Sequence, residues 1–263
     1  MSTLKYKYNC KLGVVDHRDF LFALKATPYS GVLPSKVDLT EFCSPVTAQG
    51  KIGSCTAQAV ASLFEFEQLE QFRITQNTGA TLFEGEYSTV SRLFIYYYER
   101  VLQGTVDEDS GAEIRDGIKV LSHQGVCREV SWEYLDSNLY LKPDDAAYAE
   151  ASQHKIRQYL RLQSFLDMKH CLAAGRPFAF GMMAPEELES EEVAKTGLLH
   201  NPTSATQFLG GHAVVCVGYD DSTRRVKIRN SWGADWGDKG YFTMPYEFIA
   251  NPQYCMDFWT LIK

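Results

Sequence analysis

The chain has no long apolar run and no excess of positive charge. No stretch reaches the roughly 20 apolar residues that a membrane span needs, and residues 1–8 lack the apolar core of a signal peptide. The 33 acidic side chains outnumber the 26 basic ones, which gives a net charge of −7. We therefore expect no membrane and no nucleic acid among its partners.

Cysteine is sparse, and none of the seven lies in a Cys-x-x-Cys pair. That spacing is typical of zinc sites, so we expect no metal. Cys127, Cys171 and Cys216 lie in apolar runs, which favours buried free thiols over the alternative of three disulfides. Together with the absence of a signal peptide, this favours the cytoplasm, although the sequence by itself assigns no compartment.

The first half of the chain has helical periodicity, and the second half is rich in strands. No internal repeat or low-complexity tract interrupts it. The length allows one large domain or two subdomains, and the fold class is α+β. The pattern predicts helices over residues 55–74, 91–102, 114–123 and 167–174, and strands over residues 177–183, 213–219 and 225–230.

Cys55 is a candidate nucleophile. It follows Gly53 and Ser54 and opens a helix, for which Ser54 is a plausible N-cap. The unpaired amides of the first turn and the positive end of the helix dipole favour a thiolate there. A thiolate attacks carbonyl carbon far better than a neutral thiol does, so this position suits nucleophilic catalysis.

His212 and Asn230 are the candidate partners of that thiol. His212 begins an apolar strand, and Asn230 ends the alternating strand that follows the turn at residues 220–222. Two antiparallel strands would bring the two side chains together. The amide oxygen of Asn230 would then accept the imidazole proton and fix its tautomer, and Trp232 would cover this bond from water.

These segments resemble the papain-like cysteine peptidases of the C1 family. Gln49 stands six positions before Cys55, as the oxyanion glutamine of the family does, and residues 230–241 are close to the asparagine block of the family. Residues 109–112 resemble the loop that flanks the substrate cleft. The resemblance covers about residues 37–260 and implies a two-lobed fold, with a helical left lobe, an antiparallel β-rich right lobe and the active site between them.

The resemblance also implies a domain division and a mechanism. We expect an N-terminal extension over residues 1–36 and a catalytic domain over 37–263, mainly helical over about 37–150 and mainly β over about 151–263. Cys55 is the expected nucleophile and His212 the general base and acid. The expected substrate is a peptide or protein, and no metal or organic cofactor is implied. Asn230 would orient His212, Gln49 and the Cys55 amide would form the oxyanion hole, and Gly111, Ala112, Gly211 and Trp232 would contact the substrate.

Two departures from the family pattern stand beside the nucleophile. The family has a cysteine three positions before the nucleophile and an aromatic residue after it, whereas this chain has Ile52 and Thr56. The disulfide that tethers the nucleophile loop therefore cannot form, and we expect Ile52 to replace it by packing. The spacing from Cys55 to His212 is slightly longer than is usual for the family, which an insertion over residues 75–85 explains.

The extension is far shorter than the long helical prodomain of many relatives and resembles the short extensions of bacterial-type members. Three hypotheses stand for it. It lies over the cleft and inhibits, or it packs on the body as a stabilising arm, or Cys10 forms a disulfide with Cys55 as a redox lock.

Two alternatives to a peptidase remain. One is a different acyl transfer on the same residues, such as deamidation or transfer to an amine, and the other is a binding scaffold without catalysis. The acidic run at residues 186–192 is predicted to be a solvated surface, with a cleft rim that favours basic substrates as the alternative. The tyrosines at 96–98 are predicted to be packing residues.

Overall fold

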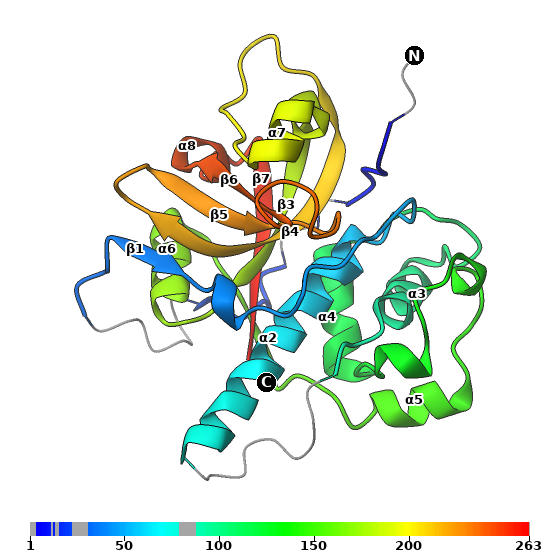
Figure 1. Cartoon of the computed structure of the whole chain (residues 1–263). Helices are drawn as coiled ribbons and strands as arrows, with labels where there is room; N and C mark the ends of the chain where they lie inside the picture. Colours follow the sequence, from blue (N-terminus) through cyan, green and yellow to red (C-terminus); the bar gives the residue numbers. More distant parts are fainter. Residues whose placement is uncertain (1–3, 12, 14–15, 23–30, 79–87, 263) are drawn as a thin grey trace.

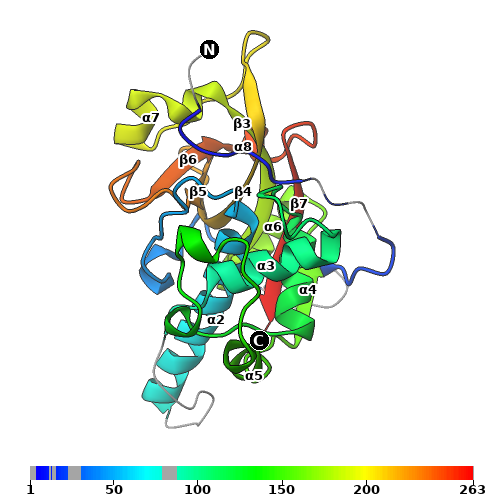
Figure 2. The ribbon, with the colours of Figure 1, turned by 90° about the vertical axis from the view of Figure 1, so that its right-hand side faces the viewer.

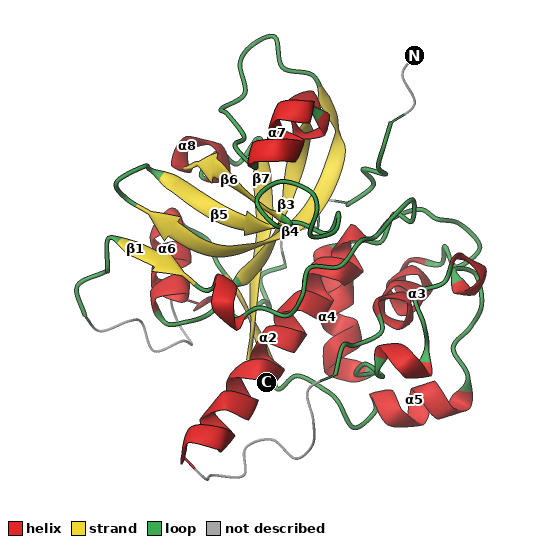
Figure 3. Ribbon diagram, in the orientation of Figure 1, coloured by secondary structure: helices red, strands yellow, loops and turns green. Residues whose placement is uncertain are grey.

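The computed structural model describes residues 4–11, 13, 16–22, 31–78 and 88–262. It has a helical lobe and a lobe built on a β-sheet, with the long helix α2 running between them (Figures 1 and 3). The predicted α+β class and two-lobed architecture are confirmed. The helices are α2 (Cys55–Thr78), α3 (Arg92–Gln103), α4 (Ile114–His123), α5 (Asp145–Ala151), α6 (Phe165–Ala173), α7 (Glu191–Thr196) and α8 (Tyr246–Ile249), with short 3-10 turns η1 (Thr40–Phe42), η2 (Glu129–Ser131), η3 (Asp136–Asn138) and η4 (Glu186–Glu189).

The sheet has the strand order β2-β7-β3-β4-β5-β6, and every neighbouring pair is antiparallel. The long strand β4 also pairs with β1, so the chain just after the predicted extension joins this sheet. The strands are β1 (Lys36–Asp38), β2 (Gln158–Arg161), β3 (Phe178–Pro185), β4 (Phe208–Asp220), β5 (Arg225–Arg229), β6 (Tyr241–Pro245) and β7 (Cys255–Ile262).

Helix α2 is the shared core of the two lobes. Residues 55–68 are buried around the whole helix, because α3 and α4 cover one side of it and β4 covers the other. A helix buried on all sides lies in the interior of a protein, and its polar side chains need hydrogen-bond partners there. The helix continues to Thr78, four residues beyond the predicted end, because no Gly or Pro interrupts residues 75–78. The predicted insertion at 75–85 is therefore helical in its first four residues, and positions 79–85 lie outside the described residues.

Most other predicted elements are close to those observed, but β4 begins five residues before the predicted strand, so His212 lies within it and not at its start. Helix α4 has the predicted bounds, and α3 begins one residue later because Ser91 is its N-cap and accepts a hydrogen bond from the Phe94 amide at 3.1 Å. Helix α3 ends at Gly104, whose φ of 70° is in the left-handed region. These agreements follow from local signals that a sequence carries directly.

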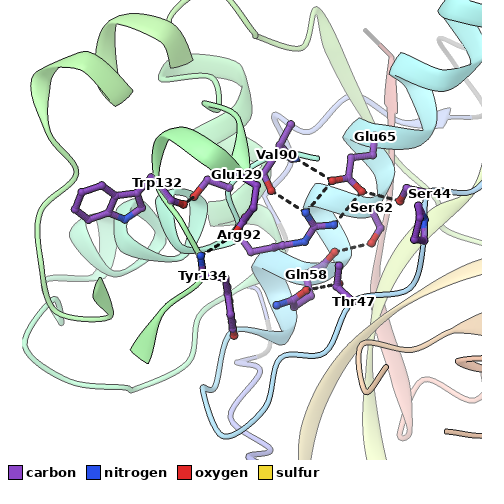
Figure 4. A network of polar contacts seen from close by, with 12 residues as sticks. Ser44, Thr47, Gln58, Ser62, Glu65, Val90, Arg92, Glu129, Trp132 and Tyr134 are labelled. Atoms are coloured by element: carbon purple, nitrogen blue, oxygen red, sulfur yellow. Dashed lines mark hydrogen bonds and ion pairs between the residues drawn. The ribbon is translucent and has the colours of Figure 1, made fainter. Parts of the chain in front are cut away.

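A buried polar network joins the lobes below the nucleophile (Figure 4). Glu65 on α2 forms an ion pair with Arg92 on α3, with Arg92 Nη1 2.8 Å from Glu65 Oε1. The same carboxylate accepts hydrogen bonds from the Val90 amide and from Ser44 Oγ at 3.0 and 2.6 Å. Arg229, the last residue of β5, donates to the carbonyl of Ser44 and to its hydroxyl. Through Ser44 this network therefore links the helical lobe to the strand that precedes Asn230.

We expect Glu65→Ala to destabilise the protein by about 3–5 kcal/mol. Both side chains of the Glu65–Arg92 pair are almost wholly buried, so the substitution removes the carboxylate that forms an ion pair with a guanidinium in the interior. Urea unfolding followed by circular dichroism measures the change. Gln76→Ala, at an exposed position of the same helix, is the matched control and should change stability by no more than about 0.5 kcal/mol. Equal unfolding midpoints for the two variants would contradict the assigned role.

Candidate active site

Cys55 lies at the first position of α2, where the two lobes meet, and is fully buried. The carbonyl of Ser54 accepts the first helical hydrogen bond, from the Gln58 amide at 3.0 Å. The Ser54 hydroxyl lies 2.6 Å from Tyr134 Oη. The first-turn position that the sequence predicted for the thiol is thus observed, with Ser54 held by a tyrosine of the helical lobe.

The β lobe brings His212 and Asn230 together. His212 lies in β4 and Asn230 directly follows β5, and these adjacent antiparallel strands place His212 Nε2 2.8 Å from Asn230 Oδ1. Nδ1 has no hydrogen-bond partner among the described residues, and the imidazole is close enough to Cys55 to help lower the pKa of its thiol. The Trp232 ring stacks over the imidazole, with centroids 5.2 Å apart and planes inclined by 27°. The indole therefore lies over one face of the imidazole.

The surroundings of Cys55 lower the pKa of its thiol well below the usual value. The largest cause is a hydrogen bond from the thiol of Cys10, and the contact with His212 and a bond from the Ala213 amide act in the same direction. Burial opposes them. The charged form of Cys55 is therefore favoured, as a thiol nucleophile requires.

Gln49 is held beside this group by hydrogen bonds along its whole length. Its amide donates to the carbonyl of Ser231 at 2.8 Å, and its Oε1 accepts from Ser231 Oγ at 2.6 Å. Its Nε2 donates one hydrogen to the carbonyl of Ile52 at 3.1 Å. The amide group has two such hydrogens, so the second is free to bind an oxyanion.

The nucleophile loop is tethered by Asp109 as well as by the expected packing of Ile52. Ile52 is buried, at 3% exposure. The Gly53 amide donates to both carboxylate oxygens of Asp109, at 3.0 and 3.2 Å, and Tyr96 Oη donates to Asp109 at 2.6 Å. Tyr96 Oη also accepts from the Gly111 amide at 3.0 Å. Tyr96 is therefore more than the packing residue that was predicted, since it joins the nucleophile loop to the loop at residues 109–112.

A buried carboxyl group behind the nucleophile was not found from the sequence. Thr56 Oγ1 donates to Glu99 Oε2 at 2.8 Å, and burial raises the pKa of Glu99 well above its usual value. The one sequence feature that pointed to this carboxyl group was Thr56, which stands where the family has an aromatic residue. A hydroxyl in place of the aromatic residue makes room for an acid at the next helix.

The N-terminal segment, residues 4–11, contacts three of the four predicted substrate-binding residues through its backbone. The Cys10 amide donates to the Gly211 carbonyl at 3.0 Å, and the Lys11 amide donates to the Ala112 carbonyl at 2.8 Å. The carbonyl oxygen of Asn9 lies so close to Gly111 that a Cβ there would be 1.9 Å away. This dark-blue segment runs between the sheet-bearing half and helices α3 and α4 (Figure 2). The segment therefore touches both lobes along the line where a substrate was expected.

Side chains of the N-terminal segment cover the fourth predicted residue, Trp232. The Tyr6 ring stacks on the indole with centroids 3.9 Å apart and planes 2° from parallel. Tyr8 meets both Trp232 and the His212 ring edge-on, and its hydroxyl donates to Glu189 Oε1 at 2.8 Å. Glu189 belongs to the acidic run predicted to be solvated, so this member of the run faces the N-terminal segment instead.

All seven cysteines are free thiols, as predicted, and all except Cys43 are buried. Within residues 4–11, 13, 16–22, 31–78 and 88–262 there is no group of three side chains suited to hold a metal ion. Over the same ranges, no helix is both long and apolar enough to span a bilayer.

The fold and this group of residues define a class of protein. The sequence profile of the papain family of cysteine proteases matches residues 101–255, more than half of the chain. The chain belongs to that family and is a cysteine protease of the hydrolase class, as the resemblance predicted.

Individual relatives agree. The chain is 40% identical over 222 residues to an uncharacterized peptidase C1-like protein of Acanthamoeba polyphaga mimivirus, covering 81% of this chain and 68% of the viral one. It superposes on the crystal structure of xylellain, a cysteine protease from Xylella fastidiosa, with a TM-score of 0.86 and 40% identity over 100% and 99% of the two chains. Cysteine proteinase 3 of Solanum lycopersicum is 26% identical over 218 residues, and this chain spans only 56% of it. The papain-like fold is thus confirmed.

Because its pKa is lowered, we expect Cys55 to remain a thiolate well below the ordinary thiol pKa of about 8.5 and to lose this charge only when the pH falls through the lowered value. The ultraviolet absorbance of the thiolate, taken as the difference between wild type and Cys55→Ala, measures the titration in the full-length protein. Cys10→Ala and His212→Ala each remove one of the groups that lower this pKa and should shift the titration to higher pH. A difference spectrum that titrates near pH 8.5 in the wild type would contradict this expectation.

Proposed function

We propose that the chain hydrolyses peptide bonds through a thioester on Cys55 and that its N-terminal extension holds it inactive. The observation that carries the proposal is the convergence of Cys55, His212 and Asn230 under a segment of the same chain. We take residues 1–36 as the extension and 37–263 as the catalytic domain, with the helical part at about 37–150 and the β part at about 151–263.

In the proposed reaction the Cys55 thiolate attacks the carbonyl carbon of a peptide while His212 carries a proton. The oxyanion is bound by the Cys55 amide and by the second Nε2 hydrogen of Gln49. His212 then protonates the leaving amine, which leaves an acyl thioester on Cys55. In the second half His212 removes a proton from water, and the resulting hydroxide attacks the thioester and releases the acid.

Asn230 and Trp232 are proposed to fix the orientation of His212 and to shield its hydrogen bond from water. The 2.8 Å contact between Nε2 and Asn230 Oδ1 supports one fixed orientation of the ring, with Nδ1 toward the sulfur. The stacked indole supports exclusion of water from this bond. The Ala112 and Gly211 carbonyls are proposed to bind the extended peptide, since they already accept hydrogen bonds from the N-terminal segment. Gly111 is proposed to let the peptide backbone approach closely, as the Asn9 carbonyl does here.

Inhibition by the N-terminal segment is supported by what it presents to Cys55. The side chain of the segment that most strongly affects the pKa of Cys55 is the Cys10 thiol, and a thiol offers no carbonyl carbon for attack. The segment therefore occupies the cleft without being a substrate. The alternative is an arm that only stabilises the body through its contacts with Gly211, Ala112 and Trp232, and the activity of a chain without the arm separates the two.

The test is to incubate a chain that begins at Leu33 with a mixture of peptides and to follow the products by mass spectrometry. A peptidase releases new peptide N-termini, and we expect these. Deamidated or amine-linked products without cleavage would assign the alternative acyl transfer. Bound but unchanged peptides, with Cys55 unreactive toward a peptidyl epoxide, would assign the binding scaffold.

A further inference from the structure

The side chains of the N-terminal segment alternate between the two lobes. Tyr6 and Tyr8 pack against the ring of one tryptophan in the β lobe. Lys7 and Asn9 face the helical lobe, where both contact Asp109: the Lys7 ammonium pairs with its carboxylate, and Asn9 Nδ2 donates to its carbonyl at 3.1 Å. Successive side chains of an extended chain point in opposite directions. A peptide on the same path would therefore present every second side chain to the region of Asp109.

Asp109 lies beside the loop that holds the nucleophile. Its carboxylate accepts from the amide of Gly53, two residues before Cys55, at 3.0 and 3.2 Å. The Asn9 side chain lies directly over Gly53, where an added Cβ would be 2.3 Å from Asn9 Nδ2. A residue in the place of Lys7 would therefore bring its side chain to the nucleophile loop.

The two carboxylate oxygens of Asp109 make different contacts. Oδ1 accepts from the Gly53 amide at 3.0 Å and from Tyr96 Oη at 2.6 Å. Oδ2 lies farther from the Gly53 amide, at 3.2 Å, and forms the ion pair with Lys7. One oxygen therefore holds the loop, and the other binds a cation.

Asp109 takes its counter-charge from the N-terminal segment. Its side chain is only 6% exposed, and within residues 4–11, 13, 16–22, 31–78 and 88–262 the one basic side chain in ion-pair contact with it is Lys7. When the segment leaves, the carboxylate keeps its hydrogen bonds to the protein but loses this cation. An ammonium or guanidinium group of a substrate restores the charge-assisted contact, whereas a neutral side chain does not.

The other two lysines of the segment have neutral partners among the described residues. Lys5 Nζ lies over the Tyr6 ring, 5.6 Å from its centroid. Lys11 Nζ donates to the side-chain amide oxygen of Gln103 at 2.5 Å. The position of Lys7 is thus the one at which the segment shows a built site for a cation.

The acidic run at residues 186–192 does not supply a second such site through Glu189. In the described part of the segment, Glu189 accepts from the Tyr8 hydroxyl at 2.8 Å and from two backbone amides at 3.3 and 3.4 Å. Hydroxyl and amide donors carry no charge, so these contacts do not distinguish a basic peptide from a neutral one. Charge selection is therefore assigned to Asp109.

We propose that Asp109 is a specificity-determining residue that selects a lysine or arginine of the substrate at the place taken by Lys7. The inference rests on the proposed function, since it takes Cys55 as the nucleophile and the path of the segment as the path of the substrate. The substrate class is then a basic peptide or protein segment, which the net charge of −7 also attracts.

The experiment treats the full-length protein with pairs of peptidyl epoxides that carry lysine or norleucine one, two or three residues from the epoxide. Norleucine has the aliphatic chain of lysine without its charge. Intact mass gives the rate of labelling, and tandem mass spectrometry locates the adduct on Cys55. We expect the lysine probe to label about tenfold faster at one of these positions, and the ratio of rates to fall as salt is added. The fraction of molecules with an open cleft affects both probes of a pair equally and cancels in the ratio.

Asp109→Asn should bring this ratio close to one. Its amide oxygen can still accept from Gly53 and Tyr96, while an NH₂ group replaces the oxygen that binds the ammonium. Any disturbance of the nucleophile loop slows both probes and leaves the ratio unaffected. Glu108→Gln, at the exposed neighbouring position of the same loop, is the matched control and should keep the ratio of the wild type.

Equal labelling by both probes of every pair in the wild type would overturn the inference, and so would a lysine preference that persists in Asp109→Asn. Failure of every probe to label Cys55 counts against it as well, because the selected side chain must lie beside a reactive thiolate. The labelling reaction needs no peptide cleavage. A lysine preference in labelling, without cleavage of any peptide by the chain that begins at Leu33, would therefore support the inference and refute the proposed function alone.

Discussion

A chain that begins at Leu33 is expected to cleave peptides about 100-fold faster than the full-length protein. The N-terminal segment is held by two backbone hydrogen bonds, by the stacked Tyr6–Trp232 pair and by the Tyr8–Glu189 hydrogen bond. For this prediction we take the net free energy of closure as about 3 kcal/mol, the size of a few hydrogen bonds or aromatic pairs of about 1 kcal/mol each. Since about 1.4 kcal/mol is a factor of ten, this leaves about one molecule in 100 open.

The truncated chain keeps the contacts that attach its new start to the sheet. Tyr219 Oη donates to the Pro34 carbonyl at 2.6 Å, and strand β1 from Lys36 pairs with β4. In the full-length protein, Tyr6→Ala should give about a tenfold increase because it removes the stacked ring. Arg18→Ala is the matched control, because this side chain is exposed and bonds only locally to Asp16. Initial rates on a fluorogenic peptide measure the activity of the truncated chain and of the two variants. If the truncated chain folds but cleaves no faster than the full-length protein, the segment does not inhibit and the stabilising-arm hypothesis is supported instead.

His212→Ala in the chain that begins at Leu33 is expected to lower kcat by about 10⁴-fold. The substitution removes the group that protonates the leaving amine and activates water, and it also removes one of the contacts that favour the Cys55 thiolate. The Asn230 oxygen also loses its partner, whereas Gln49 keeps its own hydrogen bonds to Ser231 and Ile52. KM should change little, because the backbone groups proposed to bind peptide remain.

His200→Ala is the matched histidine control. His200 is exposed, and its ring contacts Glu187 at 2.6 Å on the surface. Its removal should leave kcat within about twofold, since surface substitutions of this kind change stability by only about 0.5 kcal/mol. A loss of less than tenfold in kcat for His212→Ala, with an unchanged melting temperature, would exclude His212 from the role of base and acid.

Local signals were sufficient for most elements and for the identity of the chemical groups. The apolar run after Ser54, the turn at residues 220–222 and the capping serine of α3 each lie within one segment, so a short window of sequence contains the whole cause of the structure. The asparagine block and Gln49 identified the family because they are contiguous or closely spaced. The end of α2 was predicted too early because the polar residues at 75–78 continue a helix when nothing interrupts it.

The contacts that position the groups around Cys55 do not follow from such local signals. Asp109 binds Gly53 from another loop, Glu99 reaches Thr56 from α3, and Ser44 carries the link between Glu65 and Arg229. Each joins segments far apart in the chain, and hydrophobic periodicity contains no information on such pairs. Buried polar groups must find partners when the lobes pack, and which partners they find depends on the packing itself.

The sequence by itself determined that this protein is an α+β cysteine protease of the papain family, because its fold class follows from periodicity and its chemistry from four short motifs in a fixed order. It left three hypotheses open for residues 1–36, since an irregular segment has no periodicity that indicates where it packs. Only the tertiary structure brought the Cys10 amide onto the Gly211 carbonyl and the Tyr6 ring onto Trp232. The physical reason is that these contacts form between surfaces of two lobes that exist only after the chain has folded.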